Sequence, residues 1–281
     1  MSVDSVTQLY PVMQPELKLE GLYLQRLADD AREAGTPLVY TNYISSLDGR
    51  IAIDHPVSGE RGVPGHITNP RDWRLYQELA AGADVLLVSA RYLRELSLGK
   101  AQASMPVSDD PAFADLLEWR LQQGLRPQPA IVVLSASLDL PLSQLQALQH
   151  RGVYVATGAK HSASADRVGE IEQCGAHMLY AGDDSRVEGG RLVELLTGEG
   201  FRNIYSIAGP GVLETLVRAQ VLDRIYLTQA NRLIGGVSFD TLFEGHLLNP
   251  PADFSLRALY YDQHAGDSFA QLFGIYDLIH K

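Results

Sequence analysis

The feature that most constrains this chain is a regular alternation, from residue 37 onward, of short β-rich apolar runs with segments of helical period. Such alternation predicts an α/β domain with a largely parallel sheet. Most of the short runs are almost continuously apolar, as expected for strands that are covered on both faces. The predicted strands are Leu38–Ile44, Asp84–Ser89, Ala130–Leu134, Val153–Thr157, His177–Tyr180, Asn203–Ala208 and Arg224–Thr228.

The segments between these strands have the apolar spacing of amphipathic helices. The predicted helices are Pro70–Ala81, Pro111–Gln122, Leu142–Gln149, Ala163–Cys174, Arg191–Glu199 and Gly211–Ala219. Near the C-terminus the pattern changes, because Phe254–Tyr261 and Ser268–Leu278 are extended runs joined by a turn. They predict an antiparallel hairpin, which departs from the dinucleotide-binding fold of most dehydrogenases.

Residues 1–36 differ in character from the rest of the chain. Pro11 and Pro15 precede a helical pattern that ends near Gly35. The leucines that form this pattern are Leu17, Leu19, Leu22, Leu24 and Leu27. We therefore predict an N-terminal arm with a short helix over residues 1–36, followed by one α/β domain over residues 37–281.

The composition narrows the classes of function. A chain of 281 residues with 46% hydrophobic and 20% charged residues can bury a full core. The net charge is −11 and the 23 basic residues are scattered, which argues against a nucleic-acid partner. An anionic small molecule remains compatible with this balance, because a helix N-terminus can hold a phosphate locally.

Cysteine and histidine usage point to a reducing compartment and to no metal site. Cys174 is the only cysteine, so the chain can form no internal disulfide and no cysteine-rich zinc site. The eight histidines show no metal-ligand spacing. No apolar segment approaches the ~20 residues that span a bilayer, so we expect a cytoplasmic protein without a membrane partner.

The first predicted strand runs into a polar loop that contains an Asp-Gly pair. Ser46, Asp48 and Gly49 stand at the carboxyl end of this strand, where ligands of α/β sheets usually bind, and Asn42 lies earlier in the strand. Asp-Gly is also a frequent turn dipeptide, so the same residues fit a plain turn without a ligand. The residues alone leave both interpretations open.

A second candidate site is the glycine loop after the strand that ends at Ala208. Gly209 and Gly211 let the backbone approach a phosphate, and the start of the following helix favours its negative charge. The same residues fit an ordinary helix start with Pro210 in the first turn. The usual dinucleotide-binding motif G-x-G-x-x-G is absent.

Two pairs of polar side chains have similar alternatives. Ser135 and Ser137 follow a strand end and fit either contacts to a ribose 2′-phosphate or capping of the next turn. Arg71 and Arg74 are helical neighbours that fit either a substrate phosphate or a solvated surface.

The residues 46–52, Ser-Leu-Asp-Gly-Arg-Ile-Ala, resemble the signature of the reductase domain of the bifunctional riboflavin-biosynthesis deaminase/reductase. The resemblance extends from about residue 37 to the C-terminus at low identity. Further blocks that match in order and spacing are Ser58-Gly59-Glu60, Ile67-Thr68-Asn69 with Arg71, Asp72 and Arg74 at the start of a helix, Ala83–Val88, Ile131–Ser135, Gly209–Leu213, Val221–Ile225 and Gly235-Gly236 with Phe239.

The resemblance implies a dihydrofolate-reductase-like three-layer fold and an NADPH-dependent reductase of a small heterocycle. The implied substrate is the ribosylaminopyrimidine phosphate of riboflavin synthesis, whose ribose becomes a ribityl chain. NADPH is expected across the strand ends between Ser135 and the loop 209–212, with nicotinamide near Asn42 and the loop 46–49. The zinc deaminase motif is missing, so the resemblance implies the reductase half alone, as a homodimer.

The implied site residues form three groups. Asp48 is the candidate catalytic residue, which orients a substrate amine, relays a proton or only shapes its loop. The candidate substrate-binding residues are Asn42, Ser46, Ser58, Arg71 and Arg74. The candidate cofactor-binding residues are Gly49, Ser89, Ala90, Ser135, Gly209, Pro210, Gly211 and Val212.

The chain departs from the family pattern in two places, which keeps other functions open. Residues 89–92 replace a glycine and threonine, which weakens the expected cofactor contacts, and Ala208 replaces a glutamate. These changes motivate two alternatives, a non-catalytic ligand-binding protein and a reductase for another pteridine-like substrate. A further hypothesis is that the leucine-bearing arm and the C-terminal hairpin serve assembly.

Overall fold

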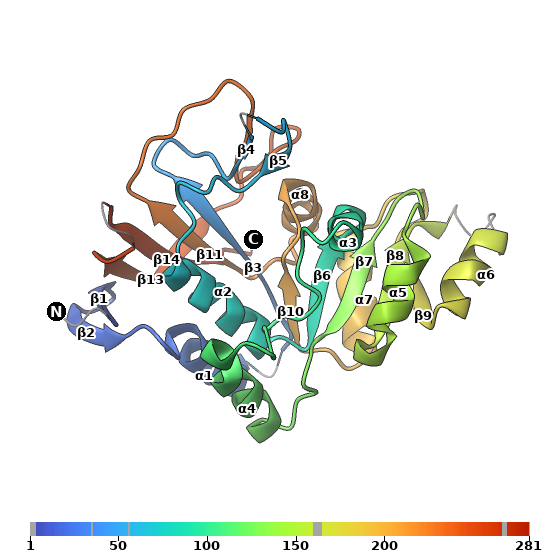
Figure 1. Cartoon of the computed structure of the whole chain (residues 1–281), viewed down its shortest axis with the longest axis horizontal. Helices are drawn as coiled ribbons and strands as arrows, with labels where there is room; N and C mark the ends of the chain where they lie inside the picture. The colour runs from blue at the N-terminus through green and yellow to red at the C-terminus, as the bar shows by residue number, and fades with distance from the viewer. Residues whose placement is uncertain (1–3, 35, 56, 160–164, 266–268, 281) are drawn as a thin grey trace.

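The computed structural model describes residues 4–34, 36–55, 57–159, 165–265 and 269–280. Within these ranges an 11-stranded sheet of order β2-β1-β13-β14-β11-β3-β10-β6-β7-β8-β9 crosses the molecule (Figure 1). Its strands are β1 (Ser5–Tyr10), β2 (Gln14–Lys18), β3 (Leu38–Ser46), β6 (Val85–Ser89), β7 (Ala130–Leu134), β8 (Val153–Thr157), β9 (Ala176–Tyr180), β10 (Asn203–Ser206), β11 (Arg224–Ala230), β13 (Phe254–Asp262) and β14 (Gln271–Leu278). A smaller 3-stranded sheet contains β4 (Ala52–Asp54), β5 (Arg61–Gly62) and β12 (Phe239–Asp240).

The sheet confirms the predicted fold class. The strands from β11 through β3, β10, β6, β7 and β8 to β9 pair in parallel. The long hairpin of β13 and β14 pairs antiparallel with β11, as predicted for the end of the chain. The predicted start of its second strand, Ser268, lies outside the described residues.

Helices cover both faces of the sheet (Figure 1). They are α1 (Leu22–Ala34), α2 (Pro70–Gly82), α3 (Ala90–Ser97), α4 (Ala114–Gln122), α5 (Leu142–Leu148), α6 (Ala165–Gln173), α7 (Gly189–Gly198) and α8 (Pro210–Arg218). One core cluster joins Leu79 of α2, Leu93 of α3 and Leu145 of α5 to the sheet. A second cluster on the other face contains Leu192 of α7 and Leu213 of α8.

The N-terminal segment enters the main sheet, which the leucine pattern did not predict. β1 pairs antiparallel with β13, and Leu17 of β2 lies opposite Val6 of β1. The helix begins only at Leu22, after Gly21 with a backbone φ of +83°. Leu17 and Leu19 therefore follow strand and turn geometry rather than helical period, because pairing with β1 satisfies this backbone. The division of the chain at residue 36 stays a prediction.

An ionic network centred on the buried Glu78 connects α1 to α2 and α4. The Glu78 carboxylate accepts the backbone N–H groups of Gly21 at 2.6 Å and Tyr23 at 2.9 Å, at the start of α1. Arg74 donates to Glu78 at 3.0 Å, and its terminal nitrogens donate to Asp115 of α4 at 2.9 and 2.5 Å. Because a buried charge is stable only when it is paired, these contacts fix the N-terminal helix against the domain.

Candidate active site

The carboxyl ends of β11, β3, β10 and β6 lie next to one another at a single edge of the sheet. The small sheet of β4, β5 and β12 lies beyond the ends of β3 and β11 (Figure 1). The strands run into four segments at this edge: the loop 47–51 after β3, the loop 231–238 after β11, the start of α3 after β6 and the start of α8 after β10. Ligands of open α/β sheets bind at this edge, so it is the candidate active site.

Asp48 joins the loop after β3 to the loop after β11. Its carboxylate accepts the Ser46 hydroxyl at 2.5 Å and the backbone N–H groups of Ile234 at 3.3 Å and Gly235 at 2.8 Å. Arg50 lies 3.2 Å from the same carboxylate. Ser46 is itself fully buried, so the first strand end and both loops form one connected unit.

These contacts hold Asp48 in its ionised form. The hydrogen bond from Ser46 is the largest cause that lowers the pKa of Asp48, to about 2, and the two amides and Arg50 act in the same direction. A carboxylate with such a pKa accepts hydrogen bonds but is a poor proton donor at neutral pH. Of the roles predicted for Asp48, the geometry favours the one that shapes the loop, and Gly49 with φ +81° makes its turn.

The starts of α3 and α8 are open at this edge. Ser89 and Gly209 are their N-caps, and neither makes a side-chain cap hydrogen bond. A Cβ atom placed on Gly209 or Gly211 would meet nothing within 4 Å. Because β6 and β10 are neighbours in the sheet, the helices that follow them, α3 and α8, both begin at this edge. This fits the pyrophosphate of a dinucleotide, which backbone amides and helix dipoles bind.

The remaining predicted cofactor residues flank these helix starts. Pro210 and Val212 lie in the first turn of α8, and Ala90 is the first residue of α3. Ser135 is 4% exposed, and its hydroxyl oxygen accepts the N–H of Leu138 at 3.0 Å. The Ser135 hydroxyl oxygen therefore caps the turn that follows β7, which is the alternative to a contact with a ribose 2′-phosphate.

The substrate-binding residues predicted from the sequence do not all meet. Asn42 lies on β3 near the candidate site and accepts the Tyr205 hydroxyl at 2.5 Å. Ser58 lies apart, in the exposed loop before β5, where its hydroxyl accepts the N–H of Glu60 at 3.3 Å. Arg74 points into the ionic network under α1 and does not reach the strand ends.

Arg71 also has structural partners. Its Nε donates to Asp262 at 2.8 Å, and its Nη2 donates to the Ser5 carbonyl at 3.0 Å. Asp262 is fully buried and also accepts from Gln271 at 2.9 Å. The arginine pair is therefore not a solvated surface, because each guanidinium is paired with a buried carboxylate, and its role at a substrate phosphate stays a prediction.

Asp72 is a candidate site residue to which the sequence reasoning gave no role, although it lies in one of the family blocks. It stands in the first turn of α2, partly buried, and shares a hydrogen bond with Thr228 of β11. Thr228 lies opposite Ile44 of β3 in the sheet, close to the strand ends. Burial raises the pKa of Asp72 to about 6, and the bond with Thr228 opposes this rise.

A sequence signal for Asp72 was present. Asp72 precedes Leu75 and Leu79, both buried, by three and seven residues, so helical period places it on the buried face of α2. A carboxylate on an apolar face, with a raised pKa and near a ligand edge, is typical of functional sites.

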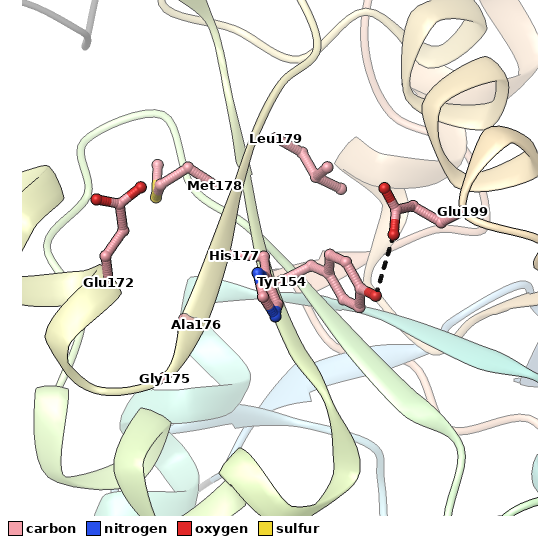
Figure 2. A pocket seen from close by; sticks show the side chains of 8 residues that line it. All are labelled: Tyr154, Glu172, Gly175, Ala176, His177, Met178, Leu179 and Glu199. Atoms are coloured by element: carbon pink, nitrogen blue, oxygen red, sulfur yellow. Dashed lines mark hydrogen bonds between the residues drawn. The ribbon is translucent and has the colours of Figure 1, made fainter.

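A surface hollow of about 480 Å³ lies away from this edge, against the outermost strand β9 (Figure 2). Tyr154, His177 and Glu199 line it, and the Tyr154 hydroxyl donates to Glu199 at 3.4 Å. None of the predicted site residues lines it. Within the described residues, no cluster of histidine, cysteine, aspartate and glutamate could hold a metal ion, and no helix is long and apolar enough to cross a membrane.

Comparison with known proteins identifies the family. The family model "RibD C-terminal domain" matches residues 37–259, most of the chain. The chain belongs to the RibD C-terminal domain family. It is therefore an oxidoreductase of the riboflavin-biosynthesis reductase type that uses a nicotinamide cofactor, and the predicted α/β fold with a mostly parallel sheet and a C-terminal antiparallel hairpin is confirmed.

Solved structures share the fold of this RibD C-terminal domain protein at low identity. A pyrimidine reductase-like protein from Corynebacterium diphtheriae has a TM-score of 0.66 and 19% identity, over 87% of this chain and 93% of the other. RibD from Acinetobacter baumannii has a TM-score of 0.59 and 17% identity, over 92% and 62%. A deaminase/reductase from Thermotoga maritima has a TM-score of 0.56 and 14% identity, over 90% and 60%. The chain thus spans about three fifths of the last two proteins. No protein of curated function matches it by sequence.

Proposed function

We propose that the protein is an NADPH-dependent reductase that converts 5-amino-6-(5-phosphoribosylamino)uracil, or the related diaminopyrimidine, to the ribityl compound. The name of the Thermotoga maritima relative gives the uracil derivative as the substrate of its reductase activity. The observation that carries the proposal is the pair of open helix starts, α3 and α8, beside a partly buried carboxylate at the same sheet edge.

The residues of this chain would have the following roles in binding and catalysis. The amides at the start of α8, with those of α3, bind the pyrophosphate. The loop unit held by Asp48 and Ser46 frames the nicotinamide and substrate. When bound, the cofactor supplies the hydride, which adds to the carbon of the ring-opened imine of the ribosylamine.

Asp72 would supply the proton that balances this addition. Hydride on carbon leaves an electron pair on the imine nitrogen, and a proton must reach that nitrogen. Asp72 has a pKa of about 6, so a fraction is protonated near neutral pH. Its carboxyl group lies at the strand ends through its contact with Thr228.

We also propose that NADPH is preferred over NADH. Arg91 of α3 lies near the helix start, and both its ion pair with Glu95 at 2.5 Å and its hydrogen bond to the Arg61 carbonyl are exposed. Exposed ion pairs contribute little to stability, so Arg91 can turn to a ribose 2′-phosphate without a large cost. Ser135 and Ser137 lie at the end of the adjacent strand β7.

A second candidate is a reductase of an unphosphorylated, pteridine-like heterocycle. The observation that favours it is the engagement of both predicted phosphate ligands, Arg71 with Asp262 and Arg74 with Glu78 and Asp115. Turnover of the phosphorylated and dephosphorylated forms of the same ribosylaminopyrimidine separates the candidates. A preference for the phosphorylated form of less than about tenfold, or 1.4 kcal/mol, would favour the second.

We further propose a cytoplasmic homodimer with no nucleic-acid partner. Leu22, Leu24 and Leu27 are buried in the core of their own chain, so the arm does not offer them to a partner. Its exposed apolar side chains are at the turn between β1 and β2, where Val12 is 70% and Met13 72% exposed. Light scattering of the full chain and of a Val12→Ser, Met13→Ser variant tests this; a monomer in both contradicts the dimer.

The proposed function is tested first by cofactor binding. Purified protein is titrated with NADPH and with NADH, and binding is followed by fluorescence and by thermal shift, because a ligand of the native state raises its stability. We expect saturable binding that is tighter for NADPH. Absence of binding at millimolar NADPH contradicts the reductase, and binding without turnover of any heterocycle supports a non-catalytic protein.

A further inference from the structure

The two outermost strands of the main sheet differ in how they are protected against further pairing. Within the described residues, the sheet ends in β2 on one side and in β9 on the other. β2 contains Pro15 and Lys18, and its Glu16 has a backbone φ of +57°. Proline, lysine and irregular backbone are features that block pairing at sheet edges. β9 has the sequence Ala-His-Met-Leu-Tyr and lacks all three, so its edge is suited to an additional strand.

The outward backbone groups of β9 follow from its pairing with β8. The N–H of Ala181, just after β9, donates to the Thr157 carbonyl of β8 at 2.8 Å. In a parallel pair, alternate residues direct both backbone groups to the neighbouring strand. Leu179 therefore faces β8, whereas Met178 and Tyr180 direct their N–H and C=O groups to the other side, where no described strand pairs. These groups form the row of unpaired donors and acceptors that is typical of a sheet edge.

The surface hollow of about 480 Å³ lies along this edge (Figure 2). The consecutive residues 175–179 all line it. Side chains of a strand alternate between the two faces of the sheet, so consecutive residues share one hollow where it follows the backbone edge. Figure 2 shows Glu172 of α6 on one side of β9 and Glu199, just after α7, on the other. The hollow is therefore a groove along the strand edge, with a carboxylate on each side.

The two carboxylates define the charge of a matching occupant. Glu172 and Glu199 are both exposed, and neither forms an ion pair with a described residue. Glu199 accepts the Tyr154 hydroxyl at 3.4 Å. Residues of an added strand also alternate between the two faces, so two basic residues an odd number of positions apart reach one carboxylate each. The groove therefore matches an extended segment with lysine or arginine on both faces.

A second copy of this chain matches the groove less well. If β9 pairs antiparallel with β9 of another copy about a two-fold axis, each face of the joined sheet carries the same carboxylate twice. Glu172 then shares its face with the same residue of the other copy, and so does Glu199. The net charge of −11 on each chain adds to this repulsion. Charge thus favours a basic partner over self-association at this edge.

We propose that the edge of β9 is a docking site for an extended, basic segment of another protein. The segment adds a strand beside β9, and its cationic side chains pair with Glu172 on one face and with Glu199 on the other. In this mode of recognition, main-chain hydrogen bonds supply affinity and side chains supply specificity. None of the predicted site residues lines the groove, so the proposal does not rest on the proposed function.

The test is binding of a fluorescein-labelled peptide, Thr-Val-Lys-Thr-Val-Lys-Thr, to the purified full chain, followed by fluorescence anisotropy at low salt. The two lysines are three positions apart, so they face opposite sides of an added strand. A second peptide has glutamate in place of both lysines. A third keeps the lysines but carries N-methyl groups on its backbone amides, which removes the donors of a strand ladder without changing the charge.

A pair of double variants separates the groove from the overall charge. Glu172→Gln with Glu199→Gln removes both carboxylates of the groove. Glu16→Gln with Glu118→Gln removes the same charge from exposed positions on β2 and α4 and is the matched control. An exposed ion pair changes Kd by up to about fivefold. The groove variant should therefore bind the lysine peptide roughly twofold to 25-fold more weakly, and the control about as tightly as the wild type.

We expect binding of the lysine peptide alone, with slower hydrogen exchange of the Met178 and Tyr180 amides when it is bound. Absence of binding at millimolar peptide overturns the proposal. Equal binding of the N-methylated peptide, or binding that the groove variant leaves unchanged, overturns it as well. Slow exchange of these amides without peptide, in a chain that light scattering shows to be a dimer, would instead assign the edge to a second copy and contradict the proposal.

Discussion

Substitution of Gly211 by aspartate should separate cofactor binding from folding. Gly211 is the second residue of α8 and is exposed, with open space where a Cβ would stand, so Gly211→Asp is accommodated without a clash. An acidic side chain in the first turn stabilises a helix by about 0.3 to 1 kcal/mol. The folded protein should therefore be as stable as the wild type or slightly more stable.

The same carboxylate should repel the pyrophosphate. For unit charges ~5 Å apart, Coulomb's law gives about 1 kcal/mol in water and about 3 kcal/mol at an effective dielectric constant of ~20. The Kd for NADPH should therefore rise roughly fivefold to 200-fold. The rise should shrink as salt is added, because ions screen exposed charges.

The assay is a fluorescence titration with NADPH at two salt concentrations, together with urea unfolding without ligand. The matched control is Gly190→Asp, because Gly190 is also the second residue of a helix, α7, and also faces open space. It should gain the same helix stabilisation with little effect on Kd. An unchanged Kd in Gly211→Asp would refute a pyrophosphate site at the start of α8.

The remaining predictions concern three carboxylates. Asp48→Asn should lower the free energy of unfolding by about 1 kcal/mol at pH 7, because the amide makes weaker hydrogen bonds than the carboxylate. The folded pKa of Asp48 is lowered to about 2, so this difference should vanish as pH falls from about 4 toward 2. Urea unfolding at several pH values measures it. Asp72→Asn should behave oppositely. The folded pKa of Asp72 is raised to about 6, so the stability of the wild type falls as pH rises through that value. The variant should therefore be more stable than the wild type at pH 8, by about 1 to 3 kcal/mol, and equally stable below pH 4. Glu78→Ala should destabilise the chain by about 3 kcal/mol, since it leaves Arg74 half-paired and two amides without acceptor; a loss below 1 kcal/mol would contradict the anchoring of α1.

The strands of the parallel sheet could be predicted because their sequence signal, a short apolar run, is local. Runs such as Ala130–Leu134 and Val153–Thr157 are almost wholly apolar, and the structure has strands with these same bounds. The short helix α3 and the strands β4, β5 and β12 were not predicted, because each is short and lacks a full hydrophobic period. Leu17 was assigned to a helix because its pairing with Val6 is a contact between segments, which periodicity does not encode.

The same difference between local and long-range signals applies to the candidate site. The loop of Asp48 and the glycine loop at Gly209 were found from contiguous motifs, and their predicted ligand roles remain proposals. Arg74 was misplaced because its partners, Glu78 and Asp115, are set by the docking of other helices. The contact between Asp72 and Thr228 joins a helix to a strand that is distant in the sequence, so it can be identified only from the folded structure.

The most direct test of the account is turnover of 5-amino-6-(5-phosphoribosylamino)uracil with NADPH by the purified full chain, followed by loss of NADPH absorbance and by the mass of the product. The account predicts substrate-dependent oxidation of NADPH, with one ribityl product formed for each NADPH consumed. Binding of NADPH without oxidation, with both the phosphorylated and the dephosphorylated compound, would contradict it.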